Sequence, residues 1–397
     1  MTPLAHVAAS VEILDAILCG TAAERCLSRW ARRNRFAGSR DRAAIRDLVF
    51  GALRCRRSLA WLGGAEDGRG LMIGHLRRSG IDPCEVFTGA GFAPGPLNQQ
   101  ETQTARRLED APSAVRLDCP DWLWPHMKES LGGGAEPILA LMQRRAPVFL
   151  RINTARTDSA TVQEALAADG IETKSHPLCG TALEVTWNAR RVRLGKAFRN
   201  GLVELQDISS QAVVEHLSPY ARGRRVLDYC AGGGGKALAL AAGGAGTVTA
   251  HDSDVSRMAD IPVRAERAAT PIDVTDAPKG EFELVLCDVP CSGTGAWRRR
   301  PEAKWSLTDA SLVRLCSLQD EILDTASRFV APGGVLAYST CSLLNVENEG
   351  RVDAFLRRQD DWWQIDSERF TPLDGGDGFF LALLGRDGER QAAAPGT

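Results

Sequence analysis

The strongest constraint on the fold is an alternation of buried strands and helices that begins near residue 206. Each predicted strand is a short apolar run, the first at 225–230 and the second at 247–252, and a glycine-rich loop or a helix follows it. Strands that alternate with helices form a mostly parallel sheet covered on both faces. The sequence therefore predicts a doubly wound α/β domain. Its further strands are expected at 270–274, 282–288, 334–339 and 379–384, and its helices at 236–242, 311–329 and 347–357.

Two other regions precede this domain. Residues 1–118 carry apolar side chains at helical spacing, such as Val7, Val11 and Leu14, and predict an all-helical domain. Residues 119–205 predict a small α/β subdomain, with strands at 148–153, 183–185 and 201–205 and helices at 122–131, 136–143 and 159–169. A length of 397 residues allows two or three domains. We therefore expect domains at 1–118, 119–205 and 206–397.

A strongly basic segment lies in the predicted helical domain, although the whole chain has a net charge of −2. Residues 20–60 contain eleven arginines and only three acidic residues. Arginine donates two parallel hydrogen bonds to phosphate, so the segment favours nucleic-acid binding. The alternative is a GC-rich genome that encodes arginine in place of lysine, since only six of the 48 basic residues are lysines.

The chain shows no sign of export or of a membrane span. No apolar run reaches the length of about 18 residues that a transmembrane helix needs, and the first 20 residues lack the basic start of a signal peptide. Its eleven cysteines form no CxxC motif and no Cys/His zinc pattern. We expect a cytoplasmic protein with reduced thiols and no metal site.

A glycine-rich loop follows the first strand of the predicted sheet and opens a helix. It runs from Asp228 to Lys236 and contains four successive glycines. Glycines let the backbone approach a ligand closely, and Asp252, at the end of the next strand, is placed to accept the hydroxyls of a ribose. These features fit either NAD or S-adenosylmethionine. Because Lys236 is followed by alanine, the loop does not match a P-loop.

Two cysteines distinguish between these cofactors. Cys291 follows the strand at 282–288, in DVPCSGTG, and Cys341 follows the strand at 334–339, in YSTCS. Doubly wound folds bind their ligands at the carboxyl ends of parallel strands, where both thiols are expected. Two thiols beside a nucleoside-type cofactor suit attack on an electron-poor carbon rather than hydride transfer. The pair therefore favours a methyltransferase.

Six segments carry a resemblance to a known family: DYCAGGGGK, DVPCSGTGAWRRRPEAKW, YSTCS followed by ENE, DGFFLALL, QDISSQ and LRIN. With them, the chain resembles the RNA cytosine-5 methyltransferases of the Sun/RsmB type. The resemblance covers the catalytic half strongly, and residues 1–118 resemble the NusB-like helical domain of the bacterial ribosomal RNA members more loosely. The chain departs from the family at 232 and 233, where it has Gly-Gly and the family usually has Ala-Pro.

The resemblance implies a Rossmann-like domain that binds S-adenosylmethionine and methylates RNA, most naturally ribosomal RNA. Cys341 would be the nucleophile, Cys291 would assist product release, Asp288 would hold the target cytosine and Lys236 would organise the site. The implied cofactor-binding residues are Cys230, Ala231, Gly232, Gly233, Gly234, Gly235, Lys236, Asp252, Asp273 and Asp288. The implied RNA-binding residues are Arg298, Arg299, Lys304, Trp305 and Arg151.

Two alternatives remain at this point. In a DNA cytosine-5 methyltransferase, Cys291 in its Pro-Cys pair would be the nucleophile. In a catalytically silent RNA-binding or ribosome-assembly factor, the fold would persist without cofactor binding, as the altered glycine loop would suggest. We expect a monomer that binds RNA and no membrane.

Overall fold

The computed structural model describes residues 1–104 and 106–386, which divide into two compact units. The first unit comprises Met1–Arg145 and Trp297–Leu307, and we call it the helical unit. The second comprises Ala146–Ala296 and the described residues from Thr308 to Arg386, and we call it the catalytic unit. Each unit is described by itself. No helix among the described residues is long and apolar enough to cross a bilayer.

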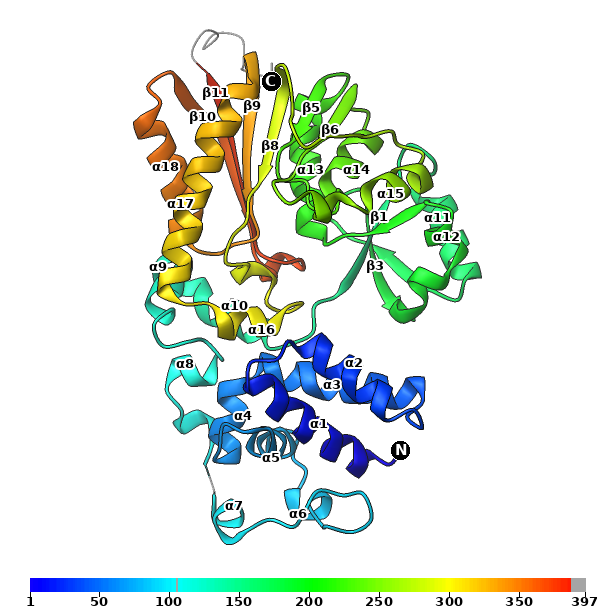
Figure 1. The fold of residues 1–397 in the computed structure, drawn as a ribbon, viewed down its shortest axis with the longest axis vertical. Coiled ribbons are helices and arrows are strands. Elements are labelled where there is room, and N and C mark those ends of the chain that lie inside the picture. The colour runs from blue at the N-terminus through cyan, green and yellow to red at the C-terminus, as the bar shows by residue number, and fades with distance from the viewer. Residues whose placement is uncertain (105, 387–397) are drawn as a thin grey trace. The chain divides into compact units, whose positions relative to one another are not determined.

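The helical unit is built around five helices that share one apolar core (Figure 1). Leu14, Ile45, Val49 and Leu71 are fully buried at its centre. The main helices are α1 (Pro3–Leu18), α2 (Ala23–Arg33), α3 (Ser39–Arg54), α4 (Arg56–Gly63) and α5 (Gly68–Arg78). Shorter helices follow: α6 (Pro83–Val86), α7 (Gln99–Gln103), α8 (Ser113–Arg116), α9 (Trp124–Leu131), α10 (Ala135–Met142) and, later in the chain, α16 (Pro301–Ser306).

The predicted domain boundary after residue 118 does not coincide with this division. Buried hydrogen bonds tie the segment after 118 to the helices before it. Asp118 accepts from the backbone N–H of Ser58 at 2.9 Å, and Gln143 donates to Asp118 and to the backbone carbonyl of Arg116. Residues 119–145 therefore pack as part of the helical unit, although the sequence analysis placed them in the α/β subdomain that follows residue 118.

The catalytic unit contains a small four-stranded antiparallel sheet in the order β2-β3-β1-β4. Leu150, Leu166, Leu183 and Val203 form its core. Its strands are β1 (Val148–Ile152), β2 (Glu172–Ser175), β3 (Ala182–Trp187) and β4 (Val203–Leu205), and its helices are α11 (Ser159–Ala168) and α12 (Lys196–Arg199). The exposed strand β2 was absent from the prediction.

The larger sheet of the catalytic unit has seven strands in the order β10-β11-β9-β8-β5-β6-β7 (Figure 1). The strands β5 to β9 are parallel, and β10 and β11 run antiparallel at one side. Their bounds are β5 (Arg225–Asp228), β6 (Thr247–Ala250), β7 (Asp273–Val274), β8 (Phe282–Asp288), β9 (Val330–Thr340), β10 (Trp362–Phe370) and β11 (Phe379–Arg386). The prediction omitted β10, in which Trp362 and Phe370, at the two ends, are the buried residues.

Helices cover both faces of this sheet, which confirms the doubly wound prediction. On strand β8, Leu284 and Leu286 belong to one apolar core, and Val285 and Cys287 belong to the other. This alternation follows from the two-residue period of a strand. The first core contains α13 (Ile208–Ala221), α14 (Gly235–Ala242) and α15 (Ile261–Ala268), and the second contains α17 (Asp309–Ala326) and α18 (Glu349–Arg358).

The order of the strands creates a natural ligand site. The chain passes outward from β5 to β6 and β7, and then returns to β8 on the other side of β5. Such a switch in direction leaves a crevice beyond the carboxyl ends of the two central strands, where ligands bind. Asp228 ends β5 and Asp288 ends β8. Of the predicted site residues, Asp288 therefore belongs to this edge of the sheet, and the glycine loop follows the end of β5 there.

Candidate active site

The glycine loop between β5 and α14 adopts a backbone that requires glycine at two positions. Gly232 and Gly234 have φ angles of +50° and +77°, a region that side-chain-bearing residues rarely adopt. A Cβ at Gly234 would lie 2.8 Å from Cγ1 of Ile261. Gly233, where the related family usually has proline, is not among the positive-φ glycines. The loop thus needs glycine at 234 for both conformation and space.

Asp252 follows β6 and holds the glycine loop against that strand. Its carboxylate accepts hydrogen bonds from the backbone N–H groups of Gly232 at 2.9 Å and Asp254 at 3.0 Å. Arg257 forms an ion pair with it at 3.0 Å, and the Asp252 side chain is 2% exposed. The carboxylate is therefore fixed in place and adjacent to the loop.

Lys236 lies in the first turn of α14 and bonds to the end of β8. Its Nζ atom is 2.6 Å from Oδ2 of Asp288, and it also lies 4.8 Å from the centre of the Phe379 ring. The lysine side chain is buried, whereas the Asp288 side chain is about one-third exposed. This ion pair orients Asp288 and leaves part of its carboxylate accessible from the crevice.

Asp228, at the end of β5, is a site residue that the sequence analysis did not single out. Burial and the neighbouring charge of Asp288 raise its pKa to about 7. Neither carboxylate oxygen makes a hydrogen bond of standard geometry to another described residue. A buried carboxyl group without a partner is costly unless a ligand supplies one. Its place beside the glycine loop fits a ligand that carries an ammonium group.

The two predicted cysteines are brought together. The Sγ atoms of Cys291 and Cys341 are 3.4 Å apart, and both residues are free thiols. The hydrogen bond to Cys341 and burial raise the pKa of Cys291 well above its usual value. Either sulfur can donate to the other in this contact. The geometry therefore brings two free thiols within reach of one ligand atom, and the thiolate is the nucleophilic form of such a group.

A buried glutamate joins the loops that carry the two cysteines. Glu347 ends the short helix η7 (Asn345–Glu347) and is fully buried. Its Oε1 atom accepts from the backbone N–H of Ser292 at 2.8 Å and from Gln319 at 3.1 Å. Its Oε2 atom accepts from the hydroxyls of Ser292 and Ser342. Because these serines follow Cys291 and Cys341 directly, the carboxylate fixes the spacing of the two thiols.

Sequence reasoning quoted Glu347 within the ENE segment but gave it no role. The sequence feature that could have indicated a role for Glu347 was its position shortly after the YSTCS segment. Its partner Ser292, however, lies in a loop that follows a different strand. Only the folded structure brings the two together.

Several predicted residues lie elsewhere or are buried. Arg151, expected to bind RNA, is 5% exposed and donates to Gln206 and to the backbone carbonyl of Gly235 at 2.8 Å, so it supports the glycine loop instead. Asp273 begins β7 and lines a separate cavity with Arg225 and Thr247, at the amino ends of β5 and β6. Asp273 pairs in register with Thr249, one residue before the end of β6, and its role in cofactor binding stays a prediction.

The other predicted RNA contacts belong to the helical unit. Lys304 is 3% exposed and donates to the backbone carbonyl of Arg54 at 3.0 Å, so it is a packing residue rather than an open phosphate contact. Arg298 is buried, Arg299 is exposed and Trp305 is half-buried. Cys230 and Ala231, in the glycine loop, are half-buried and buried, and burial raises the pKa of the Cys230 thiol.

Comparisons with known proteins identify the family of this chain. A family model described as 16S rRNA methyltransferase RsmB/F matches residues 215–384, and a model for the ferredoxin-like domain of the same family matches residues 119–190. The ribosomal RNA small subunit methyltransferase B of Xylella fastidiosa is 35% identical over 395 residues, which cover 88% of this chain and 90% of that protein. The enzyme of the same name from Salmonella arizonae is 31% identical, with 87% and 90% covered.

The fold also has a solved counterpart. The crystal structure of a methyltransferase homologue from Pyrococcus horikoshii superposes with a TM-score of 0.60 at 24% identity, covering 68% of this chain and 97% of that one. This likeness supports the Rossmann-like methyltransferase fold. Taken with the glycine loop and the paired thiols, the sequence relatives establish the identity: the chain belongs to the RsmB/F family of rRNA methyltransferases and is an S-adenosylmethionine-dependent RNA methyltransferase.

Proposed function

We propose that this enzyme methylates carbon 5 of a cytosine in small-subunit ribosomal RNA, with Cys341 as the nucleophile. The observation that carries this proposal is the 3.4 Å pair of thiols at the ligand-binding edge of the sheet. The names of the sequence relatives support ribosomal RNA as the substrate class. We also propose that the protein acts as a cytoplasmic monomer.

The chemistry explains why two thiols are needed. Carbon 5 of cytosine is too weak a nucleophile to take a methyl group until another group adds at carbon 6. The Cys341 thiolate forms a bond to carbon 6, and the displaced electron pair makes carbon 5 electron-rich. S-adenosylmethionine, when bound, supplies the methyl group. Loss of the carbon 5 proton then returns the electron pair, the bond between sulfur and carbon 6 breaks, and Cys291 assists this release.

Asp288 is placed to recognise the base. Its carboxylate is held by Lys236 and is partly accessible, so it can accept a hydrogen bond from the cytosine amino group and steady charge on the ring. The target base must be unstacked to enter such a crevice. Lys236 fixes the direction of Asp288, because its Nζ atom already occupies one side of the carboxylate.

The residues present fit S-adenosylmethionine. The buried and unpartnered Asp228 suits its ammonium group, and the fixed carboxylate of Asp252 suits the hydroxyls of its ribose. The glycine loop between them allows close approach of the backbone to the methionine portion. These three features lie at the ends of β5 and β6 and in the loop between β5 and α14.

Asp252→Ala is expected to weaken cofactor binding by roughly 1.5–3 kcal/mol, the contribution of hydrogen bonds to a charged group. The variant loses the ribose acceptor and the contact that anchors Gly232. Isothermal titration calorimetry with S-adenosylhomocysteine measures the change. Asp260→Ala, at an exposed residue that caps nothing with its side chain, is the matched control. Equal affinities for the two variants would contradict the assignment.

Cofactor affinity is expected to rise with pH and to level off above about pH 7. Because the pKa of Asp228 is raised to about 7, the free enzyme holds it protonated below that pH. Pairing with the cofactor ammonium requires the carboxylate, so binding then releases a proton and weakens by up to about tenfold per pH unit below 7. Calorimetry in buffers of different ionisation enthalpy detects that proton. In Asp228→Asn the pH dependence should vanish; if it persists, another group is responsible.

The RNA target is tested by bisulfite sequencing of total RNA from a strain that lacks the gene. A single ribosomal cytosine that loses protection would identify the substrate, and restoring the gene should restore the protection. If no ribosomal cytosine changes, the proposed substrate is wrong. Wild-type protein that fails to bind S-adenosylhomocysteine would support the silent-factor alternative instead.

A further inference from the structure

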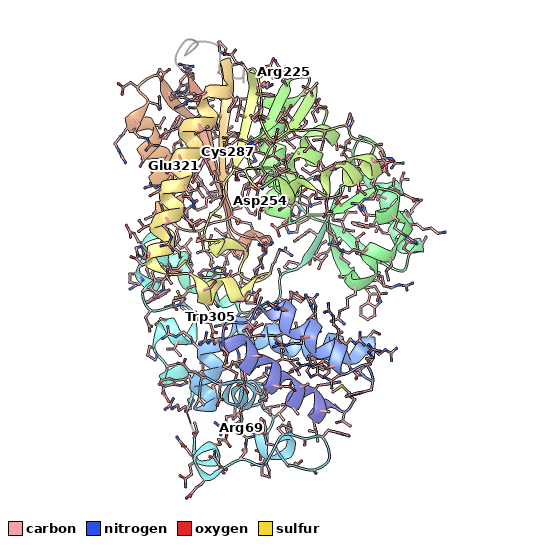
Figure 2. All side chains as sticks on the ribbon, in the orientation of Figure 1. Arg69, Arg225, Asp254, Cys287, Trp305 and Glu321 are labelled. Atoms are coloured by element: carbon pink, nitrogen blue, oxygen red, sulfur yellow. The ribbon has the colours of Figure 1, made fainter. Side chains whose placement is uncertain are left out.

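A cavity in the helical unit has the features of a nucleotide-binding pocket. It has a volume of about 520 Å³, and its lining includes residues of α4, Gly64 to Glu66 after that helix, and Trp305 of α16, which is labelled in Figure 2. Pockets for small ligands and nucleotides occupy this size range. All of its lining residues belong to the helical unit, so the cavity is separate from the thiol pair of the catalytic unit.

Two tryptophans in this cavity are fixed by their polar edges. The indole N–H of Trp61 donates to the backbone carbonyl of Arg107 at 3.0 Å, and that of Trp305 donates to the carbonyl of Leu53 at 2.7 Å. With their only donors satisfied, both indoles are held in place, and Nζ of Lys304 lies 4.5 Å from the centre of the Trp305 ring. A pre-organised aromatic face loses little entropy when a base stacks on it.

The guanidinium group of an arginine lies over each of the two indole rings. The guanidinium of Arg106 lies 5.0 Å from the centre of the Trp61 ring, and that of Arg56 lies 5.6 Å from the Trp305 ring. The nearest carboxylate recorded for Arg56 is Glu66 at 3.9 Å, which is highly exposed and at the limit of an ion pair. No ion pair is recorded for Arg106 within the described ranges 1–104 and 106–386. The two guanidiniums therefore retain donors for a ligand.

Arg57, a third arginine that lines the cavity, differs from Arg56 and Arg106 because its guanidinium is bonded within the protein. Arg57 donates to both carboxylate oxygens of Asp121 and to the backbone carbonyl of Cys119. Arg57 therefore lines the cavity with its charge paired, whereas Arg56 has only the 3.9 Å contact with Glu66, which also lines the cavity. The cavity thus combines fixed aromatic faces with two cations, which is the combination that unpaired RNA requires for its bases and its phosphates.

We propose that this cavity binds an unpaired nucleotide of the RNA substrate. The base of this nucleotide stacks on the layer formed by the indole and guanidinium groups. The phosphates on either side of the nucleotide bond to Arg56 and Arg106. The inference rests on the proposed RNA substrate and adds a second point of contact to it. An acidic peptide would satisfy the two arginines but would not use two indole faces, so we favour RNA.

The test uses the full-length protein and fluorescence anisotropy. The probes are a fluorescein-labelled oligoadenylate and the same ribose-phosphate chain without bases. Wild-type protein is expected to prefer the oligoadenylate by about 5- to 100-fold, since stacking on an aromatic side chain has this magnitude. Trp61→Ala should lose most of this preference, and Trp61→Phe should keep much of it. Arg106→Ala should weaken binding of both probes.

Arg144→Ala is the matched control, because it removes one exposed positive charge from the same unit without touching the cavity. A 5-bromouridine RNA should also crosslink to Trp61 or Trp305 in ultraviolet light. If wild-type protein binds RNA but shows no preference for bases, or if Trp61→Ala keeps its preference while folded, the pocket assignment is wrong. Displacement of RNA by polyglutamate at this cavity, with no base preference, would favour an acidic peptide. Wild-type protein that binds no RNA would overturn the proposed substrate itself.

Discussion

Replacing Cys341 with alanine is expected to abolish methylation and to prevent any covalent adduct with RNA. In the proposed mechanism the Cys341 sulfur, which lies 3.4 Å from that of Cys291, attacks carbon 6 of the cytosine. Without it, no bond forms to carbon 6, and carbon 5 is never activated. Radiolabelled methyl transfer and a denaturing gel of the enzyme–RNA mixture measure the two effects.

Replacing Cys291 with alanine is expected to give the opposite result on the gel. Attack by Cys341 and methyl transfer remain possible, but release is slowed. A protein–RNA complex that resists denaturation should therefore accumulate as a shifted band. The double variant, which lacks both thiols, should show no shifted band and is the control for non-covalent association.

This pair of variants also separates the RNA-type mechanism from that of a DNA cytosine-5 methyltransferase. In the latter, Cys291 would be the nucleophile, so Cys291→Ala would form no adduct and Cys341→Ala would retain activity. Since the two sets of outcomes exclude each other, one gel decides between them. That second set would overturn our assignment of the nucleophile.

Glu347→Gln is expected to lower kcat by about 100-fold, because small displacements of reacting groups carry penalties of this size. The carboxylate accepts bonds from four donors, and a glutamine amide replaces one accepting oxygen with a donor. The serines beside Cys291 and Cys341 would then shift apart. The KM for S-adenosylmethionine should change little, since the glycine loop is untouched. Steady-state kinetics with the RNA substrate give both constants.

Two controls distinguish positioning from general destabilisation. Glu321→Gln changes the same residue type at an exposed position of α17 and should leave kcat unchanged (Figure 2). Glu347→Asp keeps the charge and should recover part of the activity. Adduct formation by the Cys291→Ala protein should slow when Glu347→Gln is added. If kcat falls only in proportion to the folded fraction measured by thermal melting, Glu347 is structural and does not position the thiols.

The sequence by itself determined the catalytic fold and the chemistry of its centre. Strand and helix periods are local properties, so the run from RVLDYC to FELVLCD already predicted a doubly wound sheet. Cys291 and Cys341 each follow a predicted strand, and parallel strands place their carboxyl ends at one edge. The prediction that these thiols meet followed from local order alone, and the structure brings them to 3.4 Å.

Tertiary structure decided which side chains are buried and which groups they bond to. No local sequence pattern encodes either property. Arg151 and Lys304 look like RNA contacts in the sequence, but both are buried and each donates to a backbone carbonyl of a distant segment. The pKa of Asp228 depends on burial and on Asp288 from another strand. Glu347 gains its role only when loops after β8 and β9 come together. Because desolvation and long-range hydrogen bonds depend on which segments pack together, these roles become visible only in the folded chain.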